Sequence, residues 1–438
     1  MAKRAPDGAR DVTILRRLAA RIREIAARPD EERKRREWIA HNGLKRGLPR
    51  VLCFPEGAWL ECIPPETLET TDPLFRGWET RLRMAIYTHE FLGDDQVIDA
   101  VFNVPWDVQF SGWGLNVATE IPDPGRRQPY YIHPYLWLSL ESHSALGAAH
   151  YEAPIKSRAD LARLTPQTVR VNEQTSREWI ERAHEAFDGL LDVRRRGNPW
   201  LVIGGFPVTA AQLRGMENLM LDMYDDPPWV HEFVRFLATS HDTCLTALDQ
   251  GGYLTPNNGC EWIGTGGIGY TEDLPSTPVS GPVGARDIWG GLQAQDLVGI
   301  SPAMFGEFFF PHMKPIMERF GLSNYGCCEP EDEWLPLLMQ VRNLRRVSIS
   351  AWAGVRRCAE QIRNRCVFSY KPNPAALSTE RMDAAAIRRE LVAALAITRA
   401  CGCVVEIIMK DLHTVRGEPA RLRRWVELAR AAAAETYG

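Results

Sequence analysis

Short apolar runs that alternate with helical stretches constrain the fold of this 438-residue chain more than any other feature. Between the runs, apolar residues recur at helical spacing. Continuous apolar runs ended by glycine or polar residues, such as N-P-W-L-V-I-G-G-F-P at 198–207, are typical of parallel strands covered on both faces. The other runs start near Val51, Val97, Leu322, Val347, Cys366 and Val404.

The number of strand and helix units between Val51 and Lys410 is close to eight. Alternation of this kind indicates a parallel α/β fold, and a closed (β/α)8 TIM barrel is the simplest arrangement of eight units. We predict an N-terminal helical extension at 1–48 and one barrel domain at 49–438. An excursion without clear periodicity, near residues 110–150, predicts a lid or binding loop. The Pro- and Gly-rich stretch that ends at Gly291 predicts a long loop.

Composition excludes several classes of function. Hydrophobic residues make up 45% and charged residues 25% of the chain, as in globular proteins. The net charge of −4 gives no field that would attract nucleic acid. There is no apolar run of about 20 residues, the length that a membrane span requires, and no apolar signal core within the first thirty residues, so we expect a cytoplasmic protein. The ten cysteines are then free thiols or metal ligands.

Polar residues that end the apolar runs are the candidate site residues, because the active site of such a barrel lies at the carboxyl ends of its strands. The stretch L-S-N-Y-G-C-C-E-P (322–330) places two thiols and a carboxylate directly behind a strand. The candidates are Glu261, Cys327, Cys328, Glu329, Trp352, Lys371, Asn373, Glu406, Lys410, Asp411 and His413, with Glu56, Trp59 and Asn258 beside them.

Thiols and carboxylates of this kind can hold zinc, which takes about four N, S or O ligands. Cys327, Cys328 and Glu406 are the predicted metal ligands, and His413 could complete the shell if the strands are neighbours. Adjacent cysteines on a regular strand point to opposite faces, so both can reach one ion only if the chain turns at Gly326 or Glu329.

Structural alternatives stay open for these residues. The cysteine pair could be one buried and one exposed thiol, and Lys371 could pair with Glu329. Asp411 could cap a turn and His413 could be a surface histidine. Around the first strand, Trp59 could pack at the barrel mouth with Glu56 solvated.

Three segments together resemble the uroporphyrinogen decarboxylase-like superfamily. They are S-P-A-M-F-G-E-F-F-F-P-H-M-K-P (301–315), the strand L-S-N-Y-G-C-C-E, and the later K-P-N-P turn. The resemblance runs from about Pro49 to the C-terminus. That superfamily comprises barrels that decarboxylate tetrapyrroles or transfer methyl groups to corrinoid proteins and to thiols such as coenzyme M.

Two departures bear on function. At 55–62 the chain has P-E-G-A-W-L-E-C, with acids where the tetrapyrrole decarboxylase has cations for its substrate carboxylates. Where the thiol methyltransferases have a His-x-Cys pair, this chain has Tyr325-Gly326-Cys327. The resemblance therefore implies a methyltransferase that moves a methyl group between a small methylated compound and a corrinoid protein or thiol, with zinc assistance through changed ligands.

Two other functions remain open. One is a decarboxylase acting on a small aromatic acid, with Lys371 and His413 binding the carboxylate, and the other is a ligand-binding barrel without turnover. We predict catalytic roles for Glu261, Glu329, Lys371, Glu406, Lys410 and His413, and substrate contacts from Glu56, Trp59, Asn258, Trp352 and Asn373. The expected partners are a small-molecule substrate and a corrinoid-binding protein, and a homodimer is left open.

Overall fold

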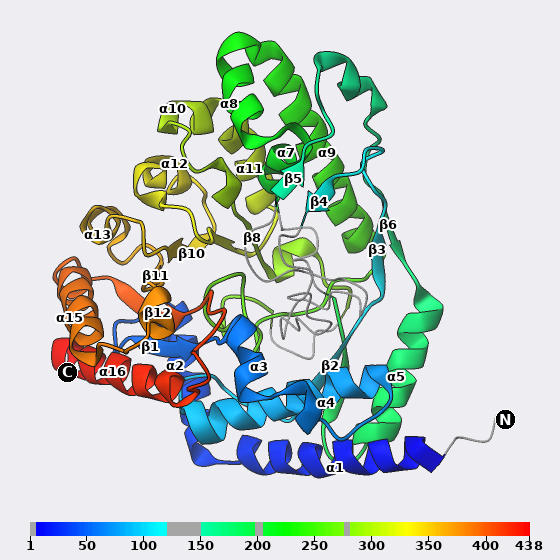
Figure 1. The fold of residues 1–438 in the computed structure, drawn as a ribbon, viewed down its shortest axis with the longest axis vertical. Coiled ribbons are helices and arrows are strands. Elements are labelled where there is room, and N and C mark those ends of the chain that lie inside the picture. The colour runs from blue at the N-terminus through cyan, green and yellow to red at the C-terminus, as the bar shows by residue number, and fades with distance from the viewer. Residues whose placement is uncertain (1–5, 121–149, 198–204, 276–280) are drawn as a thin grey trace.

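The computed structural model describes residues 6–120, 150–197, 205–275 and 281–438. Its centre is a six-stranded sheet with the order β1-β12-β11-β10-β9-β8, in which every neighbouring pair is parallel. The strands are β1 (Arg50–Cys53), β8 (Trp289–Leu292), β9 (Leu322–Tyr325), β10 (Leu344–Ile349), β11 (Val367–Tyr370) and β12 (Val404–Met409). The predicted α/β class with a parallel sheet is confirmed (Figure 1).

The first strand of this sheet pairs with the last, as the ends of a ring of strands would. A separate parallel pair joins β2 (Val101–Pro105) to β7 (Asp192–Arg196). Within the described residues no strand pairing connects this pair to the six-stranded sheet, and the run at 198–204 lies outside them. Closure into a barrel therefore stays a prediction.

Helices alternate with the strands of the second half of the chain, and α13, α15 and α16 lie along one outer side of the sheet (Figure 1). The helices are α1 (Pro6–Ala26), α2 (Pro29–Asn42), α3 (Trp59–Cys62), α4 (Pro73–Tyr87), α5 (Glu173–Phe187), α7 (Phe206–Arg214), α8 (Met216–Asp225), α9 (Pro227–Gln250), α10 (Pro302–Met304), α11 (Phe310–Met317), α12 (Leu335–Leu338), α13 (Val355–Ile362), α14 (Ala375–Ser378), α15 (Ala384–Ala400) and α16 (Ala420–Tyr437). None of the described helices has the length and apolar character needed to cross a bilayer.

The helix expected from Ser301 begins there, because the Ser301 hydroxyl accepts a hydrogen bond from the amide of Met304 at 3.2 Å and Pro302 occupies the first turn. A π-helical turn at 305–309 separates α10 from α11. The aromatic side chains of this segment pack into the core, where Phe305 stacks on Trp334 with ring centroids 4.2 Å apart.

Strand β8 corrects the prediction of a loop up to Gly291. Its two glycines have low β propensity, but the fold requires them at these positions. A Cβ at Gly291 would lie 1.9 Å from the carbonyl oxygen of Asn324, and one at Gly290 would lie 2.3 Å from the ring of Phe320. Glycine therefore allows β8 to approach its neighbours closely.

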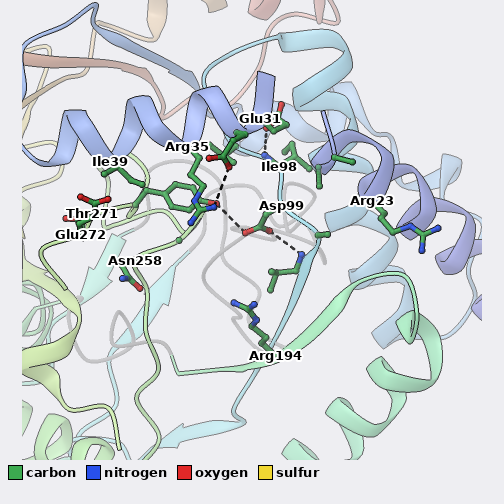
Figure 2. A pocket seen from close by; sticks show the side chains of 18 of the residues that line it. Arg23, Glu31, Arg35, Ile39, Ile98, Asp99, Arg194, Asn258, Thr271 and Glu272 are labelled. Carbon is green, nitrogen blue, oxygen red and sulfur yellow. Dashed lines mark hydrogen bonds and ion pairs between the residues drawn. The ribbon is translucent and has the colours of Figure 1, made fainter. Parts of the chain in front are cut away.

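The predicted N-terminal helices form α1 and α2, and α2 is built into the fold rather than lying on its surface. Trp38 is fully buried and donates a hydrogen bond from its indole nitrogen to the Asp95 carbonyl at 2.7 Å. Beside α2 is a cavity of about 790 Å³, lined among others by Arg35, Asp99 and Arg194 (Figure 2). A domain boundary at residue 48 stays a prediction.

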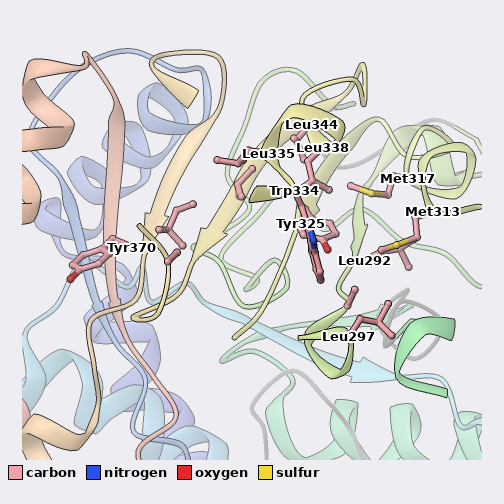
Figure 3. Packing of buried hydrophobic residues seen from close by; sticks show 14 of the residues in the cluster. Leu292, Leu297, Met313, Met317, Tyr325, Trp334, Leu335, Leu338, Leu344 and Tyr370 are labelled. Atoms are coloured by element: carbon pink, nitrogen blue, oxygen red, sulfur yellow. The ribbon is translucent and has the colours of Figure 1, made fainter. Parts of the chain in front are cut away.

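The main hydrophobic core lies between the sheet and its outer helices. Trp334 and Leu338 pack there beside Leu292, Tyr325 and Leu344 (Figure 3). This core fixes β8, β9 and β10 relative to one another, and thus fixes where each strand ends.

The predicted excursion is framed by two antiparallel pairs. These are β3 (Val108–Phe110) with β6 (Val169–Val171), and β4 (Ala118–Glu120) with β5 (His150–Glu152). Most of the excursion, residues 121–149, lies outside the described residues.

Candidate functional site

A cavity of about 590 Å³ lies at the carboxyl ends of β9, β10, β11 and β12. It is where the structure brings together the largest group of predicted site residues. Its lining includes Cys327, Cys328, Trp352, Lys371, Asn373, Lys410, Asp411 and His413. Because polar residues at parallel strand ends meet on one edge of a sheet, this rim is the candidate site.

Both cysteines face this site because the chain turns directly after β9. Gly326 has a φ of +94°, which glycine adopts without strain. The Ser348 hydroxyl donates to the carbonyl oxygen of Cys327 at 3.0 Å and holds the turn. The Sγ atoms of Cys327 and Cys328 are 3.5 Å apart. The turn at Gly326 thus makes a pair of neighbouring thiols, with Cys327 buried and Cys328 partly exposed.

Lys410 is at the centre of the cluster. Its Nζ lies 3.7 Å from the sulfur of Cys327, 3.4 Å from that of Cys328 and 2.6 Å from Oδ2 of Asp411. Burial by itself would lower the pKa of Lys410, but the surrounding sulfurs and the Asp411 carboxylate raise it well above its usual value. Lys410 is therefore a buried ammonium ion at neutral pH.

The two thiols differ in acidity. The hydrogen bond from Cys327 and the charge of Lys410 lower the pKa of Cys328, although burial opposes them. The same hydrogen bond, together with burial, raises the pKa of Cys327 well above its usual value. Cys328 is therefore the more acidic of the two thiols.

Glu56 and Asp411 form a carboxyl pair beside Lys410. Both have backbone conformations that side chains seldom adopt, with φ of +49° for Glu56 and +59° for Asp411. Such strain concentrates at functional sites. Burial, and then the charge of Asp411, raises the pKa of Glu56 to about 7, and the two side chains are hydrogen-bonded. Glu56 therefore gains or loses its proton close to neutral pH, next to the ammonium of Lys410.

Lys371 is a second buried lysine in the lining. Its Nζ donates to the carbonyl oxygen of Ser369 at 3.0 Å and to the Ser369 hydroxyl. Burial lowers the pKa of Lys371 to about 7. Among the described residues no ion pair joins Lys371 to Glu329, which was the structural alternative.

Glu329 supports the turn that carries the thiols. Its fully buried carboxylate accepts hydrogen bonds from the amides of Cys327 and Ala294, both at 2.8 Å. Burial raises its pKa while these amides oppose the change. Both oxygens are occupied by backbone donors, so Glu329 positions Cys327.

Glu406 lies in the interior, away from the cavity lining. Its carboxylate contacts Nε of Arg346 at 3.1 Å, Nε2 of His41 at 3.2 Å and the amide of Gly267 at 2.8 Å, and it accepts a hydrogen bond from Ser369. Burial opposes ionisation, but Arg346 and then His41 hold the pKa of Glu406 at about 2. These protein partners use the oxygens that a metal ion would need.

The rim of the cavity carries the remaining predicted contacts. Trp352 is 70% exposed, although its side chain is large and hydrophobic. Asn373 uses Oδ1 to accept from the amide of Ala375 at 2.9 Å, and His413 is exposed.

Besides Glu56, Glu329 and Glu406, three more predicted residues are absent from the lining of this cavity. Trp59 is buried and packs edge-on against Tyr87, at 5.7 Å between ring centroids. Glu261 pairs with Arg196 and lines a smaller cavity of about 110 Å³. Asn258 lies in the cavity beside α2 (Figure 2) and donates to the Pro275 carbonyl at 2.9 Å.

Sequence reasoning missed a buried acid behind the turn. Glu331 is fully buried, and within the described residues neither of its oxygens has a hydrogen-bond partner. Burial, and then the charge of Glu329, raises the pKa of Glu331 well above its usual value, which favours the protonated form. Its position two residues after Glu329 in E-P-E was the available signal. Ser369, His41 and Arg346 carried no motif that would have identified them.

The predicted metal ligands do not form a three-ligand group in this geometry. Among the described residues, the group whose ligand atoms all lie within 4.8 Å of one another is Asp30, Glu31 and His89. There, Glu31 already accepts from Lys34 at 2.9 Å and from the amide of Ile98 at 2.7 Å.

Comparison with known proteins gives little beyond this geometry. No family model matches the chain. No curated protein matches its sequence significantly. A solved structure, a methyltransferase from Methanosarcina mazei, is similar over 92% of this chain and 99% of its own, with 12% sequence identity and a TM-score of 0.46. A likeness of this size carries no argument about function, so membership of a family is not established.

Proposed function

We propose that the chain is a methyltransferase that removes a methyl group from a small O-, N- or S-methylated compound and delivers it to a corrinoid protein or a thiol. The observation that carries the proposal is the buried ammonium of Lys410. It lies in the lining of a cavity of about 590 Å³, at hydrogen-bond distance from an acid. A cavity of this size suits a small molecule.

The step needs a stabilised leaving group. The acceptor forms a bond to the methyl carbon, the bond between that carbon and the heteroatom breaks, and the electron pair stays on the heteroatom. Negative charge therefore develops on the heteroatom in the transition state. An ammonium already fixed by Asp411 and the Cys328 sulfur offers preorganised electrostatic stabilisation at that atom.

The departing heteroatom also needs a proton. Glu56, which lies beside Lys410 and Asp411 and has a pKa raised to about 7, can carry one close to neutral pH. We assign Glu56 as the general acid, because a catalytic pKa near the working pH gives the most effective proton transfer. Trp352 at the exposed rim would contact a flat substrate, and the acceptor would approach from this side.

Zinc assistance does not fit the donor set. The two sulfurs and Asp411 already surround the Lys410 ammonium, at 3.7, 3.4 and 2.6 Å, in the place that a metal ion would take. Glu406 is held by Arg346 and His41. We therefore assign no step to a metal. We also propose that the strand order, with β1 beside β12, belongs to a closed (β/α)8 barrel.

The test is turnover of methoxylated aromatic compounds, with reduced cobalamin or a thiol as acceptor, followed by mass spectrometry of the demethylated and methylated products. Lys410→Met should lower kcat by roughly 10²-fold or more, the effect of removing a transition-state hydrogen-bond donor. Lys156→Met, a change at an exposed lysine, is the control. Full activity of Lys410→Met would contradict the proposal.

A carboxy-lyase acting on a small aromatic acid is the second candidate, and Lys371 is the observation that favours it. A carboxylate entering the cavity would meet this buried amine, whose pKa of about 7 leaves it ready to take a proton. Release of carbon dioxide from benzoic acids, lost in Lys371→Met and kept in Lys156→Met, would favour this reaction. Binding of either compound without turnover would indicate a ligand-binding protein.

A further inference from the structure

The adjacent thiols of Cys327 and Cys328 form and break no bond in the proposed transfer step, in which the Cys328 sulfur only helps to hold Lys410. We propose that these two cysteines are a modification site, oxidised by a hydroperoxide to a vicinal disulfide that switches the cavity off. The loss of activity rests on the proposed function, whereas the disulfide itself rests on the thiol geometry alone.

The positions of the two sulfurs favour formation of a disulfide bond. The sulfurs lie 3.5 Å apart, and closing a disulfide requires a separation of about 2.05 Å. The approach is therefore a movement of about 1.5 Å, which rotation of the partly exposed Cys328 side chain can supply. The turn at Gly326 has already placed both sulfurs on one side of the chain.

The two thiols have different surroundings, which suit the two halves of an oxidation. Cys328 lines the cavity, where a small peroxide can reach it, and its sulfur lies 3.4 Å from the ammonium of Lys410, which favours a thiolate. Cys327 is buried directly behind it. Cys328 is thus placed as the attacking sulfur and Cys327 as the resolving one.

The reaction balances in two steps. The Cys328 thiolate attacks one oxygen of hydrogen peroxide, the O–O bond breaks, and hydroxide leaves with the electron pair, giving a sulfenic acid. The Cys327 sulfur then attacks the sulfenic sulfur, the S–O bond breaks, and the hydroxyl group leaves as water with the Cys327 proton. The two sulfurs lose two electrons in total, and the peroxide gains them.

Strain makes this disulfide reversible. Adjacent residues have Cα atoms about 3.8 Å apart across a trans peptide bond, below the roughly 4.4–6.8 Å found in ordinary disulfides. Strained disulfides have higher reduction potentials and are reduced easily. Oxidation would also move the Cys328 sulfur that neighbours Lys410 and reshape the cavity wall at the proposed leaving-group site.

Tryptic digestion offers a direct measurement of the disulfide. Trypsin releases residues 320–342 as one peptide that contains Cys327, Cys328 and no other cysteine. After equimolar hydrogen peroxide and alkylation of the full-length protein, this peptide should lack two alkyl groups and weigh two hydrogens less than the reduced peptide. Dithiothreitol should restore both alkylation sites.

Variants separate the two roles. Cys327→Ser should stop at a Cys328 sulfenic acid that dimedone traps, whereas Cys328→Ser should give neither product. Cys401→Ser is the control, since Cys401 is partly exposed but precedes β12, at the end of the strand away from the site. It should leave the disulfide unchanged.

The results that would overturn the proposal are equally definite. Two alkylatable thiols in the 320–342 peptide after peroxide treatment would exclude the disulfide, and so would direct conversion of Cys328 to sulfinic acid in the wild-type protein. If the disulfide forms while methyl transfer continues undiminished, the switch is refuted. The thiol measurement needs no substrate, so absence of any methyl transfer would refute the proposed function and leave the oxidation result intact.

Discussion

Replacing Glu406 by Gln is the sharpest test of how the interior below the cavity is built. The change preserves the size of the side chain but removes its charge. It leaves Arg346, which is fully buried, without its carboxylate partner at 3.1 Å. Removing one partner of a buried ion pair costs about 3–5 kcal/mol, since the other charge stays out of water.

The pKa of Glu406 gives a second estimate of the stability lost in Glu406→Gln. It is held at about 2, against an ordinary value of 4.5. At 1.36 kcal/mol for each pKa unit, this difference corresponds to about 3 kcal/mol in favour of the ionised folded state. Arg346 keeps a hydrogen bond to Asn42 at 2.7 Å, so we expect the lower end of the range, about 3 kcal/mol.

The sign of the pH dependence follows. Because the pKa of Glu406 is lower in the folded state, its stabilising contribution is complete above about pH 4.5 and is lost as the pH falls toward 2. The free energies of unfolding of wild type and Glu406→Gln should therefore differ by about 3 kcal/mol at pH 7 and converge below pH 4.5.

Urea denaturation followed by circular dichroism at pH 7, 5, 4 and 3 measures this difference. Glu333→Gln, at a side chain 57% exposed, is the control and should change the free energy by less than about 0.5 kcal/mol. A loss below 1 kcal/mol in Glu406→Gln, or a loss that stays constant from pH 7 to 3, would refute the reasoning. A loss of turnover without a loss of stability would favour the catalytic role predicted from sequence.

Three further outcomes follow from the site. Since Glu56 must be protonated to act and its pKa is about 7, kcat/KM should fall as pH rises through 7, and Glu56→Gln should abolish that limb of the pH profile. Lys371→Met should raise the free energy of unfolding at pH 7, because the folded-state pKa of Lys371, about 7, lies below the ordinary 10.5. The gain should shrink as the pH rises from 7 to 10, and urea denaturation at both pH values measures it. Gly326→Ala should lower stability by about 1–3 kcal/mol in the same assay, since φ is +94° and the added Cβ would lie 2.7 Å from a carboxylate oxygen of Glu331.

The strand ends that build the cavity could be predicted because their signal is local. An apolar run that stops at polar residues marks a strand end, and parallel strands place such ends on one edge. Cys328, Lys371, Lys410 and His413 were found in this way, and the structure lines one cavity with all four. The length of an apolar run and the identity of the residue that ends it are enough to predict a residue at this edge of the sheet.

Other parts of the site depend on contacts that no local pattern contains. Glu261 ends no described strand and lies next to the Trp262–Ile268 bridge, so its apparent place after an apolar run was misleading. His41 reaches Glu406 across 365 residues of sequence. The positive φ values of Glu56 and Asp411 arise where two distant segments meet, and neither residue type predicts such a backbone conformation.

The separate roles of Glu406 and Lys410 follow from depth along one strand. Residues four apart on a strand face the same side, and at about 3.3 Å per residue they are about 13 Å apart along it. Lys410 follows the last residue of β12 and reaches the thiols, whereas Glu406 lies within the strand, opposite Arg50 of β1 and Ser369 of β11. A single ion cannot bridge that span. The same face of β12 therefore supplies a folding network at its base and a reactive cluster at its rim.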